Sequence, residues 1–547
     1  MNTPKALTSA LGLLLVVQEA VAAPLPLPST LPGQIDPNLQ RQQQELIQRQ
    51  QEIETRARRI EVPALQGDAP ETQTLPSSQQ TFVLKGIHFN KSVFLDEAKL
   101  HAMAQDYVGR SIRFDDINEL LKQINALYEK AGQLTARAVV PPQNVENGIL
   151  SIVLVEAKVD AIKWQTPPNK VNERFYTERL GIEPEQTLDS AALVAAISRF
   201  NSTTPGPQLS ANLAPGERFA TTRVDLEAFE PDPLQWSLFT NNYGNEGTGR
   251  AQYGGSLTWF SPTGVADALN AVVVASTGSE YGSLRYSRPV NRYNGVMFVE
   301  VGANNTKVKK GPYSALNIEG DSKSYGIGYD QPWWVNHNWT LLGGLAYNYQ
   351  TSESTIEGLD LSEVDIDDFT LKGQVEYRAA PWYGRYEQRI RHAKFDNPIN
   401  GDSGSHQLFN GMGYLSRDFG SAFQAVGRLG WQYSSDAENL PSALMYQFGG
   451  ISSLRGYDAG VITSPQGVTL NMEAYWRYRD NIQPFVFYDY GRAMKLGVSD
   501  IDLQSIGIGV NFNWGKHVSV SVVAASTLKD VTPDQDSGQV LAQLIIR

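Results

Sequence analysis

Cysteine is absent from this chain of 547 residues, and several kinds of site are excluded with it. There can be no disulfide framework, no thiolate metal site and no cysteine nucleophile. The six histidines lack the spacing of metal ligands, and no G-x-S-x-G or P-loop string occurs. These histidines are His88, His101, His337, His392, His406 and His517. We therefore expect no enzyme, no metal site and no cofactor.

Long apolar runs are also missing after the first residues. The N-terminus has Lys5, an apolar stretch from Ala6 to Val17 and then Ala20-Val21-Ala22, which is the pattern of a secretory signal peptide over residues 1–22. No later stretch approaches the roughly 20 apolar residues of a membrane-spanning helix. If the mature protein is integral to a membrane, it must therefore cross as a β-barrel. The net charge of −12 argues against a nucleic-acid partner.

Glycine and aromatic residues are plentiful, with 47 Gly, 24 Tyr, 20 Phe and 10 Trp, which is typical of β structure with tight turns. Between Gln235 and Ile546 we predict sixteen strands in which apolar and polar side chains alternate, an even number as closed bacterial barrels have. The acidic stretch Glu353 to Asp368 is predicted to be a solvated extracellular loop rather than a calcium site. The charged side chains expected to line the lumen are Arg385, Glu387, Arg389, Arg391, Glu473, Arg477 and Arg479.

Before these strands, helical and strand patterns occur in the order β-α-α-β-β, first over residues 81–157 and again over residues 158–231. The first strand is expected at Phe82 to Phe89, and Asn147-Gly148 gives a strong hairpin signal. The pattern predicts two small modules in tandem, and two generic α+β domains would fit it as well.

Residues 23–80 hold a polar helix, at about 36–60, followed by a linker. Leu39, Leu46, Ile53 and Ile60 recur at a spacing of seven, so the apolar seam of this helix is very narrow. The pattern alone favours a solvated helix over a weak coiled coil.

Two short strings carry the functional signal. Leu454-Arg455-Gly456-Tyr457 lies in the middle of a long connection, residues 434–466, between the eleventh and twelfth strands. The second string, Phe487-Tyr488-Asp489-Tyr490-Gly491, lies on the thirteenth strand, where Asp489 shares a face with Phe487 and Gly491. A charge at membrane depth is costly unless it is paired, so Arg455 is the natural partner for Asp489.

These strings resemble the (V/I/L)RG(Y/F) and F-x-D-x-G motifs of the Omp85 superfamily. The whole chain is similar to its two-partner secretion branch (TpsB, the haemolysin activator and filamentous haemagglutinin exporter type). The resemblance implies two periplasmic POTRA domains at 81–157 and 158–231 and a 16-stranded antiparallel transmembrane β-barrel at 232–547. It also implies that loop 434–466 folds into the barrel, that Arg455 meets Asp489, and that the N-terminal helix closes the lumen at rest.

Further implications concern function. The chain would recognise an unfolded β-rich exoprotein (a TpsA partner such as a haemolysin, adhesin or contact-dependent toxin) and secrete it through the outer membrane of a Gram-negative bacterium. Its other partners would be outer-membrane lipid and the barrel-assembly machinery. An assembly factor of the same superfamily and a passive porin are the alternatives. One departure is the C-terminus, Leu544-Ile545-Ile546-Arg547, which lacks the terminal aromatic residue of many outer-membrane barrels.

Two hypotheses stay open for Arg455 and Asp489. The pair either only stabilises the barrel or moves during transport. Gly456 is expected to allow a tight backbone at the tip of the loop.

Overall fold

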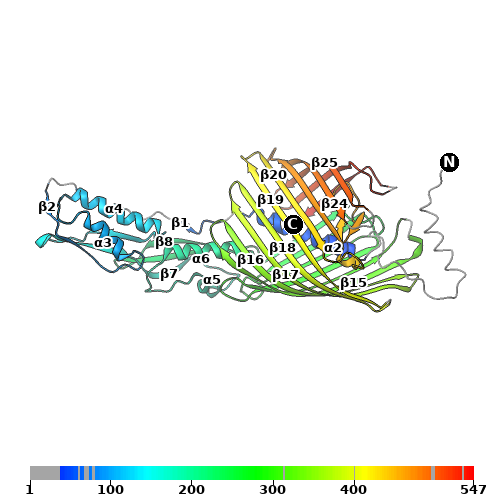
Figure 1. Ribbon diagram of the computed structural model, residues 1–547, viewed down its shortest axis with the longest axis horizontal. Coiled ribbons are helices and arrows are strands. Elements are labelled where there is room, and N and C mark those ends of the chain that lie inside the picture. The colour runs from blue at the N-terminus through cyan, green and yellow to red at the C-terminus, as the bar shows by residue number, and fades with distance from the viewer. Residues whose placement is uncertain are drawn as a thin grey trace.

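The computed structural model describes residues 37–59, 62–66, 73–76, 80–311, 314–399, 401–494, 499–532 and 535–547. The predicted signal peptide lies outside the described residues. The molecule is elongated, with two small α/β modules at one end and a barrel at the other (Figure 1). Among the described residues, no helix combines the length and the apolar character needed to cross a membrane.

The first module packs two helices against a three-stranded sheet of order β3-β6-β5. Its elements are β2 (Phe82–Val83), β3 (Gly86–Phe89), α3 (Glu97–Gln105), β4 (Ser111–Ile112), α4 (Phe114–Lys130), β5 (Ala136–Val139) and β6 (Ile149–Glu156). The strand predicted at Phe82 to Phe89 is divided, because β2 pairs with β4 while β3 pairs with β6. The apolar face of α4, which includes Ile117 and Leu121, is buried in the core of this module.

The second module repeats this arrangement. Its elements are β7 (Lys158–Thr166), α5 (Glu173–Leu180), α6 (Ser190–Thr203), β8 (Gln208–Pro215) and β9 (Thr221–Phe229). Its sheet has the order β1-β8-β9-β7, in which the two-residue strand β1 (Leu65–Gln66) comes from the linker after the N-terminal helix. The order of secondary structure expected for both modules is therefore present.

Sixteen antiparallel strands close into a barrel, as predicted. They are β10 (Leu234–Asn241), β11 (Gln252–Phe260), β12 (Ala268–Ala275), β13 (Ser279–Pro289), β14 (Val296–Lys307), β15 (Ile318–Val335), β16 (Trp339–Ile356), β17 (Leu359–Ala379), β18 (Trp382–Asn397), β19 (Asp402–Phe419), β20 (Phe423–Ser434), β23 (Gln466–Trp476), β24 (Ile482–Met494), β25 (Ile501–Trp514), β26 (Val518–Thr527) and β27 (Gly538–Ile546). The barrel closes where Leu238 to Asn241 pair with Gln543 to Ile546.

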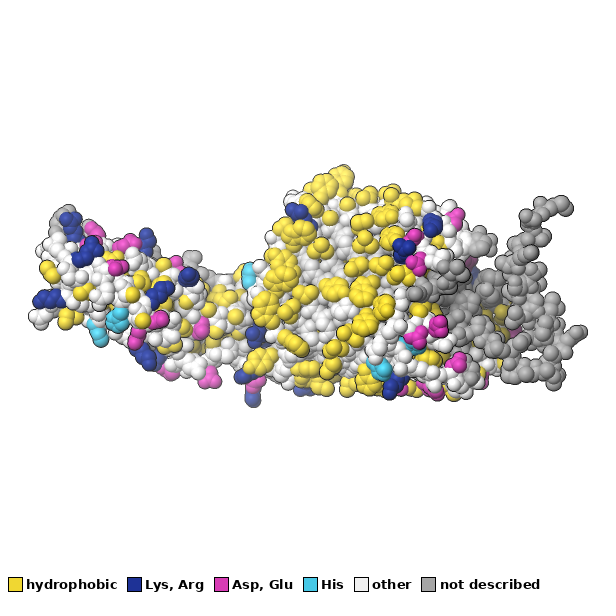
Figure 2. Space-filling view, viewed as in Figure 1, with side chains coloured by type: hydrophobic (Ala, Val, Ile, Leu, Met, Phe, Trp, Pro, Cys, Tyr) yellow, Lys and Arg dark blue, Asp and Glu magenta, His cyan; other side chains and the backbone are white. Residues whose placement is uncertain are grey.

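The outer wall of the barrel is apolar. Hydrophobic side chains cover it in the space-filling view, and charged side chains gather on the modules and at the opposite end of the barrel (Figure 2). Eight of the ten tryptophans are exposed at the strand ends nearest the modules, where they form the aromatic girdle of a membrane interface. They are Trp236, Trp259, Trp333, Trp334, Trp339, Trp382, Trp476 and Trp514. The girdle marks the edge of the membrane-spanning wall that is nearest the modules.

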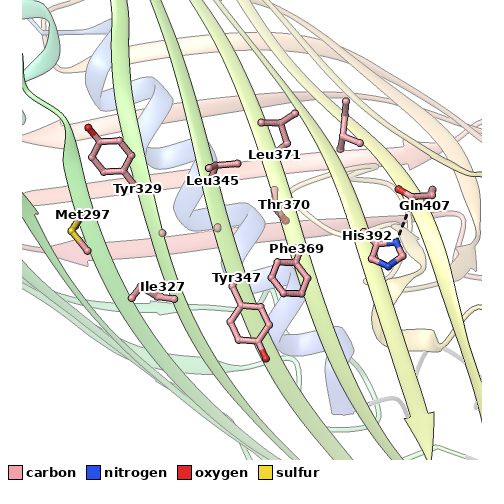
Figure 3. A pocket seen from close by; sticks show the side chains of 13 residues that line it. Met297, Ile327, Tyr329, Leu345, Tyr347, Phe369, Thr370, Leu371, His392 and Gln407 are labelled. Carbon is pink, nitrogen blue, oxygen red and sulfur yellow. Dashed lines mark hydrogen bonds between the residues drawn. The ribbon is translucent and has the colours of Figure 1, made fainter.

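A shallow hollow of about 560 Å³ lies on this outer wall between β14 and β19 (Figure 3). Its lining is apolar, and includes Ile327, Leu345, Phe369 and Leu371, all of which are exposed on the outer face. Because these side chains face lipid, the hollow belongs to the membrane surface and not to the lumen.

The acidic stretch predicted as a loop is instead a long hairpin. Glu353 lies in β16 and the residues from Leu359 onward lie in β17, joined by a tight turn at Glu357-Gly358, where φ is +50° and +77°. The strand pairing simply continues past the apolar wall into water, so the charges sit on paired strands. The prediction of a loop was wrong because a run of charged residues indicates that the segment is exposed to water, and does not indicate whether its backbone forms a loop or a strand.

The second module is docked on the barrel. Phe260, at the end of β11, and Ala266, in the turn between β11 and β12, are buried in the apolar core of the module. Arg179 of α5 donates to Asn294 Oδ1 (2.8 Å) and to the Asn291 carbonyl (2.9 Å) in the turn between β13 and β14. Burial lowers the pKa of Arg179 to about 10, so the guanidinium remains charged at neutral pH. This junction fixes the module beneath one side of the barrel.

Candidate functional site: a plugged lumen with an inward-folded loop

The N-terminal helix α2 (Pro37–Ala57) lies inside the barrel, where it is the blue helix seen through the wall in Figure 1. Its polar side chains bond to the wall: the Asn38 amide donates to Ser352 Oγ (3.0 Å) and the Gln43 amide to the Tyr243 carbonyl (3.0 Å). The solvated helix favoured by the sequence pattern is therefore wrong. A polar lumen accepts a polar helix, so the pattern of a surface helix and that of a lumen helix are the same.

The narrow apolar seam of α2 has specific partners. Leu39 is buried against Gly460 of the long loop, where a Cβ would lie 2.3 Å from Leu39 Cδ1. Ile53 packs in a small cluster with Tyr383 and Tyr414 of the inner wall. Leu39 thus holds the N-terminal part of the helix, and Ile53 holds its C-terminal part.

The C-terminal end of α2 is held by charge. Arg56 Nε lies 2.9 Å from Glu376 Oε2 of β17, and the Arg378 guanidinium donates to the Arg56 carbonyl (2.8 Å). A cation at the C-terminal end of a helix satisfies free carbonyls and the helix dipole. Among the described residues, α2 therefore has ordered contacts with the wall from Asn38 to Arg56.

The loop between β20 and β23 folds back into the barrel. It contains a short hairpin, β21 (Tyr446–Phe448) paired with β22 (Ile462–Ser464), and its tip carries Leu454 to Tyr457. Leu454 and Tyr457 are fully buried with Phe448, Ala493 and Leu503. The tip is thus packed against the inner wall at β24 and β25.

The structure brings Arg455 and Asp489 together. Arg455 Nε and Nη2 donate to the two oxygens of the Asp489 carboxylate (2.9 and 2.6 Å), and the Arg455 N–H donates to Oδ2 (3.1 Å). Asp489 also accepts a hydrogen bond from the Asn471 amide (2.8 Å), and Arg455 stacks on the Phe487 ring, 3.6 Å from its centroid. Asp489 is 0% exposed and Arg455 5%. Both ions are therefore desolvated and depend on this bidentate geometry.

A second carboxylate extends this pair into a chain of charges. Glu473 of β23 accepts from Arg455 and lies 2.6 Å from Arg428 Nη1 of β20. Arg428 also donates to Glu54 of α2 (2.6 Å). Five alternating charges, Glu54, Arg428, Glu473, Arg455 and Asp489, thus connect the plug helix to the tip of the loop.

The motif glycines make room for the loop. A Cβ on Gly456 would lie 2.7 Å from Ser505 Cβ and 3.2 Å from the Ser526 backbone, and a Cβ on Gly491 would lie 2.7 Å from Leu454 Cδ1. Gly456 has no positive φ, whereas Gly449, Gly450 and Gly460 of the same loop do. Its predicted role in a tight backbone was therefore wrong. Glycine is needed there because any side chain would collide with the wall and prevent the close approach of the loop tip.

Most of the predicted lumen charges lie on the inner wall. Arg385 and Arg389 both pair with Glu387, and Arg391 pairs with Asp368. Arg477 and Arg479 do not belong to this set, because β23 ends at Trp476 and both residues lie in the turn that follows. Arg477 pairs with Asp418 there, and Arg479 is exposed. Their prediction as lumen residues was wrong because the alternation continued past the end of the strand.

Several residues of the site were not predicted. Gln539 of β27 donates to the Arg455 and Tyr457 carbonyls (2.8 and 2.7 Å), and Asn471 faces both Asp489 and the Ser453 carbonyl. The alternation of side chains along the predicted strands could have identified Asn471 and Arg428, because it places both on the inner face of the barrel. Nothing in the sequence pattern connects Glu54 to the barrel.

Comparison with known proteins gives two family matches. A model described as a POTRA domain, ShlB-type, matches residues 82–157, and one described as haemolysin secretion/activation protein ShlB/FhaC/HecB matches residues 220–513. The haem/hemopexin transporter protein HuxB of Haemophilus influenzae is 22% identical over 83% of this chain and 85% of its own length. The haemolysin transporter protein ShlB of Serratia marcescens is 23% identical over 73% of this chain and 72% of its own. The solved structure of CdiB from Escherichia coli, at 18% identity, covers 96% of this chain and 100% of its own with a TM-score of 0.72, which shows a shared fold.

Proposed function

Because this chain belongs to the ShlB/FhaC/HecB family of haemolysin secretion and activation proteins, we propose that its barrel is the pore through which one secreted exoprotein leaves the cell. The protein is a two-partner secretion transporter of the Gram-negative outer membrane, with its modules in the periplasm. The observation that carries the proposal is a barrel of sixteen strands, wide enough for an aqueous channel, whose lumen is occupied by the chain's own polar helix and loop.

The partner that fits is a TpsA-type exoprotein, which arrives unfolded and rich in β-forming sequence. A haemolysin, an adhesin and a contact-dependent toxin are the candidate cargoes. Folding of the exoprotein outside the cell, together with diffusion through the pore, supplies the driving force, so no enzymatic step is required of this chain. Outer-membrane lipid around the apolar wall and the barrel-assembly machinery are its other partners.

We assign residues 81–157 and 158–231 to two POTRA domains and residues 232–547 to the barrel. The ShlB-type match over residues 82–157 supports the first domain. The same order of elements in the second module, from β7 to β9, supports the second. In this assignment residues 1–22 are the signal peptide and residues 23–80 carry the plug helix and its linker.

In the resting state α2 fills the lumen, and for transport it must leave. Most of its contacts with the wall are hydrogen bonds of polar side chains, each of which contributes only a small net free energy. Arg455 and Asp489 are the fixed part of the site, because they are desolvated and removal of one partner costs about 3–5 kcal/mol. The plug is therefore the element that moves, and the loop tip is the anchor.

An assembly factor and a passive porin are the rival functions. A porin that conducts small solutes needs neither two periplasmic modules nor a helix across its lumen. An assembly factor that inserts other proteins into the membrane does not need its own lumen closed by a helix. The helix inside the lumen therefore favours export.

The test is export of the exoprotein encoded beside this chain's gene. Cells would produce the wild type, Arg455→Ala, the exposed control Arg479→Ala, or no chain, and barrel folding would be checked by heat-modifiable mobility on gels. We expect export by the wild type and by Arg479→Ala, and at least a tenfold loss in Arg455→Ala with the barrel still folded. Undiminished export without the chain would contradict the proposal and favour the assembly factor.

A further inference from the structure

The hollow on the outer wall is a groove between two rows of outward-facing side chains (Figure 3). Successive strand pairs join the first row, which consists of Tyr329, Leu345, Leu371 and Ile390. The second row lies two residues nearer the end of the barrel that is away from the modules, and consists of Ile327, Tyr347, Phe369, His392 and Gln407. Between the rows, Gly328, Ala346 and Thr370 point to the lumen, so the floor of the groove is largely backbone.

The groove rises obliquely through one half of the membrane-spanning wall. Tyr329 is four positions from Trp333 on β15, and His392 is ten positions from Trp382 on β18, where both tryptophans belong to the girdle nearest the modules. At about 3.4 Å per residue and a strand tilt of about 40°, Tyr329 and His392 are about 10 Å and about 26 Å from the girdle along the membrane normal. Because the apolar band of such a barrel is about 25 Å tall, the groove runs from near the middle of the membrane to its far surface.

The dimensions of the groove fit one acyl chain. Its lining extends from Met297 on β14 to Gln407 on β19, which is five strand spacings or about 24 Å. Over that length it climbs about 16 Å, close to the half-thickness of about 15 Å of a hydrocarbon core. A chain laid in the groove contacts both rows at once and gains dispersion contacts with each. Because the modules lie in the periplasm, this half of the membrane is the outer leaflet.

Polar side chains gather at the outer end of the groove. The Gln407 amide donates to His392 Nδ1 (2.7 Å), so the neutral imidazole carries its proton on Nε2 and can donate it to a ligand. Lys394 is exposed one row further out, and Asp367 beside it accepts from the Tyr347 hydroxyl (2.5 Å). The strand pairs place five side chains next to one another in that row: Tyr325, Tyr349, Asp367, Lys394 and Ser405. The groove therefore ends at a cation and several hydrogen-bonding groups, at the level of lipid head groups.

This head end distinguishes among lipids. The outer leaflet of a Gram-negative outer membrane is built from lipopolysaccharide, whose lipid A carries saturated acyl chains on a phosphorylated glucosamine disaccharide. Lys394 can donate to the phosphate, and the rings of Tyr325 and Tyr349 offer apolar faces to a sugar. Asp365 and Asp396, one row further out, repel the phosphate and keep it at the level of Lys394. A glycerophospholipid has a phosphate but no sugar ring for these two tyrosines.

We propose that this hollow is a binding site for lipid A of the outer leaflet, with one acyl chain along the groove and one phosphorylated glucosamine at Lys394. The inference concerns the outer wall and does not depend on what passes through the lumen. The bound lipid contacts the strands from β14 to β19 together, so it fastens the side of the barrel whose β16–β17 hairpin continues into water.

The experiment measures the lipid that the purified, folded chain retains in detergent, by native mass spectrometry. The probes are bisphosphorylated lipid A, the same lipid A without its phosphates, and phosphatidylethanolamine. Leu345→Trp fills the groove, and Ile508→Trp on β25 is its control, because Ile508 is 63% exposed outside the hollow and Leu345 is 62% exposed within it. Lys394→Ala removes the cation at the head end, and Lys516→Ala, in the exposed turn between β25 and β26, is its control. Heat-modifiable mobility on gels would check the folding of each variant.

We expect the wild type, Ile508→Trp and Lys516→Ala to bind bisphosphorylated lipid A at least tenfold more tightly than phosphatidylethanolamine. Leu345→Trp should bind both forms of lipid A at least fivefold more weakly, whereas Lys394→Ala should weaken binding of the bisphosphorylated form alone. Equal binding of lipid A and phosphatidylethanolamine by the wild type would show a wall that accepts any lipid, and would overturn the inference. Lipid A binding that neither Leu345→Trp nor Lys394→Ala lowers below its control would overturn it as well.

Discussion

Arg455 owes its position to three neighbours that differ in kind. Asp489 supplies a bidentate carboxylate, Glu473 a second negative charge, and Phe487 a ring face 3.6 Å from the guanidinium carbon. Lysine could satisfy the charge but not the fork geometry or the stacking, so the site is specific for arginine. With two carboxylates against it, the guanidinium fixes the loop tip in one position.

Gly456→Ala is predicted to weaken the anchored loop. The added Cβ would lie 2.7 Å from Ser505 Cβ and 3.2 Å from the Ser526 backbone, so the tip or the wall has to shift, at a cost of about 1–3 kcal/mol. Protease sensitivity of the loop in outer membranes should therefore rise several-fold.

The matched control for this change is Gly427→Ala in β20, where a Cβ meets nothing within 4 Å. It should leave the loop as resistant as the wild type. Equal protease sensitivity in both variants would show that the close approach at Gly456 has no role in anchoring.

For single residues, the sequence predicts an ion pair better than it predicts a network of several charges. Asp489 and Arg455 were predictable because a charge on an inward face of a membrane strand demands a partner. Glu54 was not, because it is one of several carboxylates on a polar helix and only the tertiary fold brings it to Arg428. Arg477 and Arg479 were wrongly predicted to line the lumen, because the alternating pattern continues in the sequence beyond Trp476, where the strand ends.

Among the elements, α2 is held in the lumen by polar contacts that can be removed one at a time. Arg56→Ala deletes the ion pair with Glu376 near the C-terminal end of the helix, where the Arg56 side chain is 27% exposed. We expect the purified variant to conduct ions in planar bilayers several times more often than the wild type, because that end of the plug is released.

Arg58→Ala is the control, since Arg58 directly follows α2, and its side chain is 72% exposed and only weakly paired to Glu54. Its conductance should match that of the wild type. A plug that remains closed in Arg56→Ala would show that this ion pair does not hold the helix.

A second element-scale prediction concerns the junction between the second module and the barrel. Arg179→Ala removes the hydrogen bonds to Asn291 and Asn294, while Arg174→Ala on the same helix alters only an exposed pair with Glu178. Hydrogen exchange of the turn at 291–294 should quicken in the first variant and stay unchanged in the second. Unchanged exchange in both would mean that the Arg179 hydrogen bonds do not hold the junction.

For the elements, periodicity predicted the strands and the order of each module, because alternate burial leaves a direct trace in the sequence. The placement of α2 could not be read from its own pattern, since a narrow apolar seam fits water and a wet lumen equally. The hairpin of β16 and β17 was misread as a loop because its upper part is polar on both faces.

For the whole molecule, the central claim is that the barrel is an export pore closed by its own helix. The plug, the linker and the two modules follow one another along the chain, and contacts tie each to the next. The fixed Arg455 tip and the movable α2 have different roles because the tip is held by a bidentate, buried ion pair, whereas α2 is held largely by single hydrogen bonds.

The most direct test joins the plug to the wall through Asn38→Cys and Ser352→Cys, at positions whose native side chains are 3.0 Å apart. Export of the adjacent-gene exoprotein would be compared in the oxidised and reduced states of this one variant. The account predicts that export stops when the disulfide forms and returns on reduction. Full export with the helix cross-linked in the lumen would contradict it.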